Sequence, residues 1–146
     1  MSNQLPMTIL LVEDNDFDAE LTLRALQQYN LSNQIVRFAD GQEALDYLFQ
    51  TEIPNGDEKR VNPKLILLDL KLPGVSGMEV LQAVKNNLRT KCIPIVALTS
   101  STEEEDNVKS YELGVNSFIS KPVEFDQFME SMKNLGLYWL LLNKTP

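Results

Sequence analysis

The sequence predicts one α/β domain, built as a doubly wound sheet of five parallel strands with helices on both faces. Two observations lead to this fold class. Short apolar runs alternate along the chain with stretches whose apolar residues recur at helical spacing. The run at residues 65–68 consists of four consecutive aliphatic residues, which is typical of a strand buried on both faces of a parallel sheet. Successive strand and helix units form such a sheet through right-handed crossovers.

The N-terminal part contains two strand and helix units. Residues 7–12 form the first predicted strand, and an acidic turn separates it from a helix predicted at 17–29, whose apolar residues recur every three or four positions. A second strand is predicted at 34–38 and a second helix at 41–49. Residues 51–63 are polar and contain two prolines and an Asn-Gly pair, so we expect a long surface loop there.

The central unit is a strand at 64–68, Asp69 directly after it, and a helix at 76–86. Pro73 and Gly77 interrupt the chain between strand and helix. A carboxylate after four buried aliphatic residues is costly unless it lies at the carboxyl end of the strand, where an open α/β sheet has its ligand crevice. Taken alone, Asp69 has an ordinary alternative role as the cap of a turn.

The C-terminal part repeats the pattern twice more. A strand is predicted at 93–98 and a helix at 103–113, which opens with acidic residues that suit the dipole of a helix N-terminus. The last strand is predicted at 117–120, and a long helix at 124–142.

The length of the chain and its even composition indicate one domain. The 146 residues are enough to bury a core without disulfides, and no linker, internal repeat or low-complexity tract interrupts them. We expect a single domain over residues 1–146, with a core at about 7–135 and a helical extension at about 136–146.

The composition excludes several classes of function. The net charge of -8, with no basic stripe, argues against binding to nucleic acids or anionic membranes. The absence of histidine excludes Ser-His-Asp triads and His-ligated metals. The single cysteine, Cys92, excludes an internal disulfide and is predicted to be a small buried hydrophobe. No signal pattern or membrane-length apolar run is present, so we expect a cytoplasmic protein.

Polar side chains follow four of the predicted strands at the point where each strand ends. Glu13 and Asp14 follow the first strand, Asp69 the third, Thr99 the fourth and Lys121 the fifth. The carboxyl ends of parallel strands lie at one edge of a sheet. We therefore expect carboxylates, a hydroxyl and an ammonium group in one crevice.

These residue types predict magnesium-dependent phosphoryl chemistry. Carboxylates without histidine or cysteine suit a hard cation, and Mg²⁺ takes one or two carboxylates together with a phosphate. With Asp69 as the nucleophile, the metal and Lys121 would neutralise the oxygens of an incoming phosphoryl group. The Thr99 hydroxyl could hydrogen-bond the product.

The same residues resemble those of the receiver domains of two-component response regulators, over nearly the whole chain. The motifs that carry the resemblance are Glu13-Asp14, Asp69 with Leu72-Pro73 and Gly77, Thr99 followed by Ser100, and Lys121-Pro122. The resemblance implies a flavodoxin-like receiver fold with strand order 2-1-3-4-5. It also implies a phosphoacceptor signalling protein rather than an enzyme, which takes its phosphoryl group from a sensor histidine kinase and assists its own phosphotransfer and dephosphorylation.

The resemblance assigns the metal site residue by residue. Asp69 would be the phosphoacceptor. Asp14 and Asp69 would hold Mg²⁺, helped by Glu13 through a water molecule and by the backbone carbonyl of Lys71. Glu13 stands where many members have aspartate, which makes its direct ligation of the metal less certain.

The resemblance also implies a switch. Lys121 and Thr99 would assist the transfer, after which Thr99 would move toward the phosphoryl group and Phe118 would turn inward. Ordinary core packing is the alternative role for Phe118. The Lys121-Pro122 peptide is often cis in this family.

Two further features resemble the stand-alone regulators paired with cyanobacterial phytochromes. The loop at 51–63 is longer than in the commonest receivers, and the pair Tyr138-Trp139 lies near the end of the chain. This narrower resemblance implies a phytochrome-type kinase as the partner.

The last predicted helix suggests a partner of a second kind. Residues 137–142 are six consecutive apolar residues, and at 100° each they cannot all face one core. We expect a homodimer through the face formed by 103–113, 117–120 and the last helix, because most soluble oligomers are symmetric pairs. In the alternative, the tail folds back on its own domain.

Three other functions use similar residues or a similar fold. A haloacid-dehalogenase-type phosphatase needs a second aspartate two residues after the first, where this chain has Lys71. A flavodoxin-like electron carrier needs a phosphate-binding first loop, and the acidic residues 13–16 would repel a phosphate. An interaction module that has lost phosphorylation is the third possibility. The intact set of Asp14, Asp69, Thr99 and Lys121 argues against it.

Overall fold

The computed structural model of the chain describes residues 8–27, 34–49, 63–71, 76–100 and 114–136. The predicted helix at 103–113, the pair Leu72-Pro73 and the apolar tail at 137–142 lie outside these ranges, as does the surface loop at 51–63 except for Pro63.

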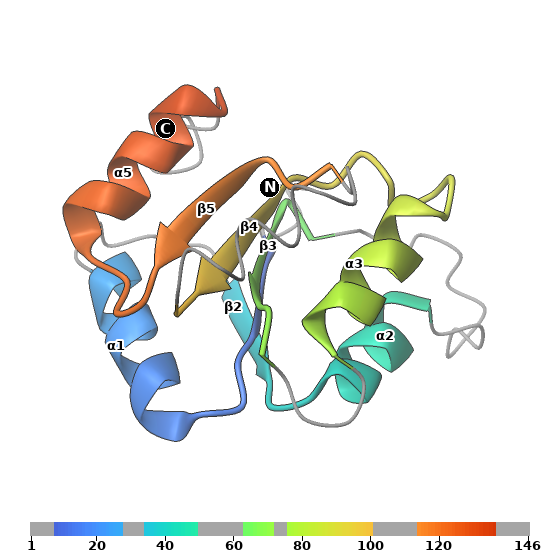
Figure 1. Cartoon of the computed structure of the whole chain (residues 1–146), viewed down its shortest axis with the longest axis horizontal. Coiled ribbons are helices and arrows are strands. Elements are labelled where there is room, and N and C mark those ends of the chain that lie inside the picture. Colours follow the sequence, from blue (N-terminus) through green and yellow to red (C-terminus); the bar gives the residue numbers. More distant parts are fainter. Residues whose placement is uncertain (1–7, 28–33, 50–62, 72–75, 101–113, 137–146) are drawn as a thin grey trace, which may run out of the picture.

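A five-stranded parallel sheet with the order β2-β1-β3-β4-β5 forms the centre of the molecule, which confirms the predicted fold class and strand order (Figure 1). Its strands are β1 (Thr8–Val12), β2 (Gln34–Phe38), β3 (Leu65–Asp69), β4 (Ile95–Thr99) and β5 (Ser117–Ser120). The described helices are α1 (Asp16–Gln27), α2 (Gly41–Phe49), α3 (Gly77–Lys85) and α5 (Phe125–Asn134).

The sheet separates two apolar cores, because alternate residues of a strand face opposite sides. On one side Ile9, Leu67 and Leu98 pack with residues of α1 and α5. On the other side Leu68 and Ala97 pack with residues of α2 and α3. Figure 1 shows the two pairs of helices on opposite faces of the sheet. Full burial of an aliphatic side chain contributes about 1.5 to 3 kcal/mol, so the double layer accounts for the uninterrupted apolar runs of the central strands.

The third and fourth strands are displaced toward their carboxyl ends relative to the prediction. Strand β3 begins at Leu65 and includes Asp69, because the pairing with β4 continues through Asp69 and the Leu70 amide then donates to the carbonyl of Leu98 at 3.3 Å. Strand β4 begins at Ile95, because the Ile93 amide bonds the Thr90 carbonyl in the preceding turn. These two predicted boundaries were wrong by one or two residues.

The last helix is shorter than predicted. Helix α5 ends at Asn134, the Gly136 amide donates back to the carbonyl of Lys133 at 3.1 Å, and Gly136 has a φ of 73°. Glycine adopts this left-handed conformation without steric cost and commonly ends a helix in this way. The prediction of one continuous helix over 124–142 was therefore wrong.

Two other local predictions can be compared with the structure. Cys92 is exposed, which corrects its predicted burial, because it lies in the turn before β4 rather than in the strand. The peptide bond between Lys121 and Pro122 is cis, as the family resemblance implied. Within the described ranges, no helix is long and apolar enough to cross a membrane.

Gly77 joins the start of α3 to the end of β3. A Cβ atom at this position would lie 2.5 Å from the carbonyl oxygen of Asp69 and 2.6 Å from the Cα of Leu70. Ser76 caps the helix beside it through a capping box with Glu79, each side chain accepting from the other residue's amide at 3.2 Å. The absence of a side chain at Gly77 therefore lets the helix start directly against the strand end that carries Asp69.

Candidate functional site

The strand ends bring the predicted site residues together at one edge of the sheet. Glu13 directly follows β1, Asp69 and Thr99 are the last residues of β3 and β4, and Lys121 directly follows β5. The Glu13 and Asp69 side chains both contact the Lys121 ammonium. Thr99 is buried, and its carbonyl accepts from the Lys121 amide at 2.8 Å.

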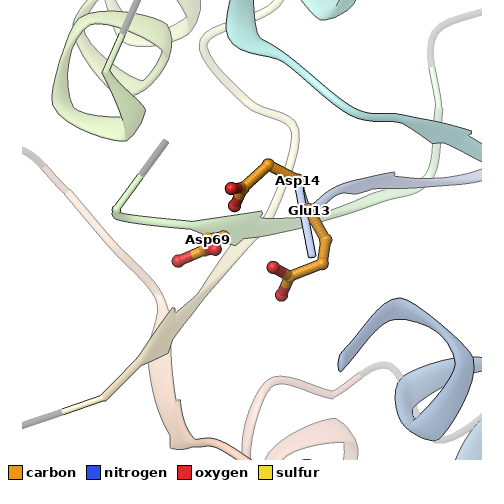
Figure 2. A group of neighbouring side chains, drawn as sticks. All are labelled: Glu13, Asp14 and Asp69. Carbon is orange, nitrogen blue, oxygen red and sulfur yellow. The ribbon is translucent and has the colours of Figure 1, made fainter. Parts of the chain in front are cut away.

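Glu13, Asp14 and Asp69 form an acidic cluster, here called the acid triad. One carboxylate oxygen of each residue lies within 4.8 Å of the corresponding atoms of the other two. Figure 2 shows the three side chains around the ends of β1 and β3, with their carboxylates on the same side. Glu13 and Asp69 are buried, and Asp14 is exposed. A set of oxygen ligands with one solvent-facing member fits a hard divalent cation that keeps part of its water shell.

The Asp69 carboxylate has a different partner for each oxygen. The backbone amide of Lys71 donates to Oδ1 at 3.0 Å, and the Lys121 ammonium lies 3.2 Å from Oδ2. A carboxylate held from two sides keeps one orientation, so Asp69 is presented in a fixed position at the end of β3.

Lys121 is the cation at the centre of the site. Its Nζ atom lies 3.3 Å from Glu13 Oε1, 3.2 Å from Asp18 Oδ2 and 3.2 Å from Asp69 Oδ2. Burial opposes the charge of the ammonium, but the charges of Asp69 and Glu13 and the hydrogen bond to Asp18 outweigh it and raise the pKa of Lys121 above its ordinary value. Lys121 is therefore a permanent positive charge in the working pH range.

The surroundings of Glu13 in the cluster disfavour its ionised form. Burial, the hydrogen bond to Asp69 and the charge of Asp69 together raise the pKa of Glu13 from its ordinary 4.5 to about 7, although the Asn15 amide and the charge of Lys121 act in the opposite direction. A divalent cation beside the two carboxylates would relieve this repulsion.

Sequence reasoning missed two residues of the site, Asp18 and Arg37. Asp18 contacts Lys121 from the first turn of α1. The Arg37 guanidinium on β2 donates to the carbonyl of Glu13 at 3.0 Å from Nε and at 2.8 Å from Nη2, and it pairs with Asp16 at 2.9 Å. In the sequence, Arg37 could be linked to the site only through its positive charge and its place on the strand next to the acidic turn.

Phe118 lies on the face of the sheet opposite Ile119. It is half-buried, stands beside Ala97 of β4 in the register, and packs against the core formed with α2 and α3. Core packing therefore accounts for Phe118 in this conformation.

The raised pKa of Glu13 predicts a pH-dependent stability in metal-free protein. Since the folded-state pKa of about 7 exceeds the ordinary 4.5, the folded state binds more protons between these values, and the free energy of unfolding should fall as pH rises from 4.5 to 7. At about 1.4 kcal/mol per pH unit, the expected loss is up to about 3 kcal/mol. Urea unfolding in a chelator at pH 5, 6, 7 and 8 measures it.

Glu13→Gln should remove this component of the pH dependence, since glutamine does not titrate. Glu20→Gln is the matched control, because Glu20 is an exposed residue of α1 that pairs with Arg24. Parallel stability profiles for wild type and Glu13→Gln would contradict the prediction.

The family model of the response regulator receiver domain matches residues 9–133. The chain belongs to this family. The matched region contains the acid triad, Thr99 and Lys121, so the family assignment covers the whole of the site just described.

Two curated relatives match along most of their length. The chain is 39% identical over 141 residues to the probable methanogenesis regulatory protein FilR2 of Methanothrix harundinacea, covering 97% of this chain and 88% of that protein. It is 37% identical over 136 residues to the response regulator Rcp1 of Synechocystis, covering 92% of this chain and 90% of that protein.

The similar solved structures include phytochrome response regulators. The bacteriophytochrome response regulator RtBRR is 51% identical with a TM-score of 0.84, over 97% of this chain and 85% of that one. The phosphorylated cyanobacterial phytochrome response regulator RcpA is 37% identical with a TM-score of 0.71, over 97% and 99% of the two chains. The Mn²⁺-bound form of Rcp1 is 35% identical with a TM-score of 0.72, over the same 97% and 99%.

Proposed function

We propose that this receiver domain is a response regulator in which Asp69 accepts a phosphoryl group from a sensor histidine kinase in a Mg²⁺-dependent reaction. The observation that carries the proposal is the setting of Asp69. Its carboxylate is buried, is held by the Lys71 amide and the Lys121 ammonium, and lies in the acid triad. The phosphorylated state of the relative RcpA supports a phosphoacceptor role.

The transfer is a displacement at phosphorus. An oxygen of the Asp69 carboxylate forms a bond to phosphorus, the bond from phosphorus to the imidazole nitrogen of a phosphohistidine breaks, and the imidazole leaves with the electron pair. Lys121 stabilises the negative charge that gathers on the phosphoryl oxygens. Thr99, the last residue of β4, would hydrogen-bond the product through its hydroxyl.

The donor set of the acid triad fits Mg²⁺. Asp14 and Asp69 would hold the ion, with Glu13 acting through a water molecule and the carbonyl of Lys71 as a further ligand. The bound ion supplies neutralisation of the phosphoryl oxygens. The existence of a Mn²⁺-bound form of Rcp1 supports the binding of a divalent metal.

The relatives also support a place in signalling. A phytochrome-type kinase is the proposed phosphodonor, since RtBRR and RcpA are phytochrome response regulators. We further propose that the protein is cytoplasmic and forms one domain over residues 1–146. It acts as a phosphoacceptor rather than as an enzyme. It signals through a switch of Thr99 and Phe118 and through dimerisation. The proposed dimer uses β5, α5 and residues 103–113 together with the C-terminal tail.

Intact-mass spectrometry tests the proposal directly. Wild type and Asp69→Asn are incubated with acetyl phosphate, with Mg²⁺ or with a chelator. We expect the mass of one phosphoryl group on wild type with Mg²⁺ only, and none on Asp69→Asn. Gel filtration of the same samples then tests the dimer. No gain of mass under any condition would favour the interaction-module alternative.

A further inference from the structure

We infer that Asp18 is a positioning residue that holds the Lys121 ammonium in the site while the other partners of Lys121 change. The inference rests on the proposed function. Asp18 lies in the first turn of α1, and Lys121 follows β5, so their contact at 3.2 Å links two elements that are 103 residues apart in the chain.

The three N–H groups of Lys121 are shared among three carboxylates, those of Glu13, Asp18 and Asp69. Two of these three belong to the acid triad, and Asp18 does not. A metal ion would draw Glu13 and Asp69 toward itself, and a phosphoryl group would occupy an oxygen of Asp69. Of these three carboxylates, Asp18 is therefore the one whose contact with Lys121 the reaction leaves in place.

The geometry of Asp18 suits this role. Its backbone amide donates to the Asn15 side chain at 2.8 Å. This bond fixes the first turn of α1 and hence the direction from which the Asp18 carboxylate approaches Lys121. The side chains of Lys121 and Asp18 are 13% and 29% exposed, so water screens their pairing only in part. A lysine side chain has several rotatable bonds, and a fixed carboxylate on the solvent side keeps the ammonium directed at Asp69.

Charge alone predicts the opposite effect on rate. Acetyl phosphate is an anion, so removal of the Asp18 charge would favour its approach and speed the reaction. Loss of positioning would slow it. The charge effect acts on the approach of acetyl phosphate and therefore below saturation. The rate at saturating acetyl phosphate and Mg²⁺ is free of it and reports on positioning.

Asp18→Asn keeps the shape of the side chain and removes its charge. In the assay, an oxygen of Asp69 bonds to the phosphorus of acetyl phosphate while the bond from phosphorus to the acetate oxygen breaks, and acetate leaves with the electron pair. We expect the saturated rate to fall about fivefold, the effect of losing a partly exposed ion pair. Asp18→Glu, which keeps a carboxylate, should recover part of the rate. Glu20→Gln, which removes an exposed charge from the same helix, should react like wild type.

A second measurement reports on Lys121 with Mg²⁺ and without a phosphodonor, the state in which the metal would draw Glu13 and Asp69 away from it. The ¹⁵N ammonium resonance of Lys121, assigned by comparison with Lys121→Arg, should be sharp in Mg²⁺-saturated wild type and Glu20→Gln and lost in Mg²⁺-saturated Asp18→Asn. Either a retained resonance or an unchanged or faster rate in Asp18→Asn overturns the inference. If wild type takes up no phosphoryl group, the proposed function fails, and the ammonium resonance still decides whether Asp18 orders Lys121.

Discussion

Gly77→Ala is expected to lower the free energy of unfolding by about 2 to 3 kcal/mol, the cost of overpacking a buried position. The added Cβ would lie 2.5 Å from the Asp69 carbonyl oxygen and 2.6 Å from the Leu70 Cα. Both neighbours are backbone atoms, so no side chain can turn away to make room. Either α3 retracts or the end of β3 moves, and the second response displaces Asp69 from the acid triad.

Urea unfolding and calorimetric titration with Mg²⁺ measure the two consequences. Gly136→Ala is the matched control, since a Cβ there meets nothing within 4 Å and the substitution costs only the left-handed backbone conformation at φ 73°. That cost is about 1 to 2 kcal/mol. We expect weaker Mg²⁺ binding in Gly77→Ala and unchanged binding in Gly136→Ala. A Gly77→Ala protein with wild-type stability would show that the close packing of α3 on β3 is not a constraint.

Lys121→Met is expected to have opposite effects on stability and on metal affinity. Without the ammonium, the carboxylates of Glu13, Asp18 and Asp69 lose their shared cation, and breaking a buried pair in this way costs about 3 kcal/mol or more. The pKa of Glu13 should rise still further above its ordinary value. The loss of stability should therefore be larger at pH 8 than at pH 5, where Glu13 is protonated in the folded variant. Mg²⁺ should bind more tightly, because the competing cation is gone.

Unfolding at the two pH values and Mg²⁺ titration measure these effects, and intact mass should show phosphoryl uptake slowed about a hundredfold. Lys85→Met is the control, because the Lys85 ammonium donates to the carbonyls of Lys91 and Ile93 rather than to a carboxylate in the contacts that the structure describes. An equal loss of stability at pH 5 and pH 8 would argue against electrostatic repulsion as its cause.

The fold and the acid triad could be predicted because they depend on short-range signals. Uninterrupted aliphatic runs mark strands buried on both faces, and a parallel sheet places every strand end on one edge. The position of Glu13, Asp69, Thr99 and Lys121 then follows from chain order alone. No knowledge of side-chain direction is needed to bring these four residues together.

The partners that sequence reasoning missed depend on side-chain direction. Asp18 reaches Lys121 only because the first turn of α1 has one particular rotation about its axis, and the other acid of that turn, Asp16, pairs with Arg37 instead. Apolar periodicity fixes such a rotation to within one residue, which is too coarse to choose between these two acids. Element ends were missed for a similar reason, since the end of α5 depends on the backbone conformation of a single residue, Gly136.

The ion pairs of Lys121 connect residues that are distant along the chain. Its partners Glu13, Asp18 and Asp69 are separated from it by 108, 103 and 52 positions. Contacts of such separation form only after the intervening segments have been ordered, because loop closure must be completed before they stabilise the chain. A nascent or partly folded chain thus has Asp69 without its cation. If Asp69 accepts a phosphoryl group as proposed, uptake is restricted to molecules whose first and last strands have both joined the sheet, and the contacts that assemble the site also act as a check on complete folding.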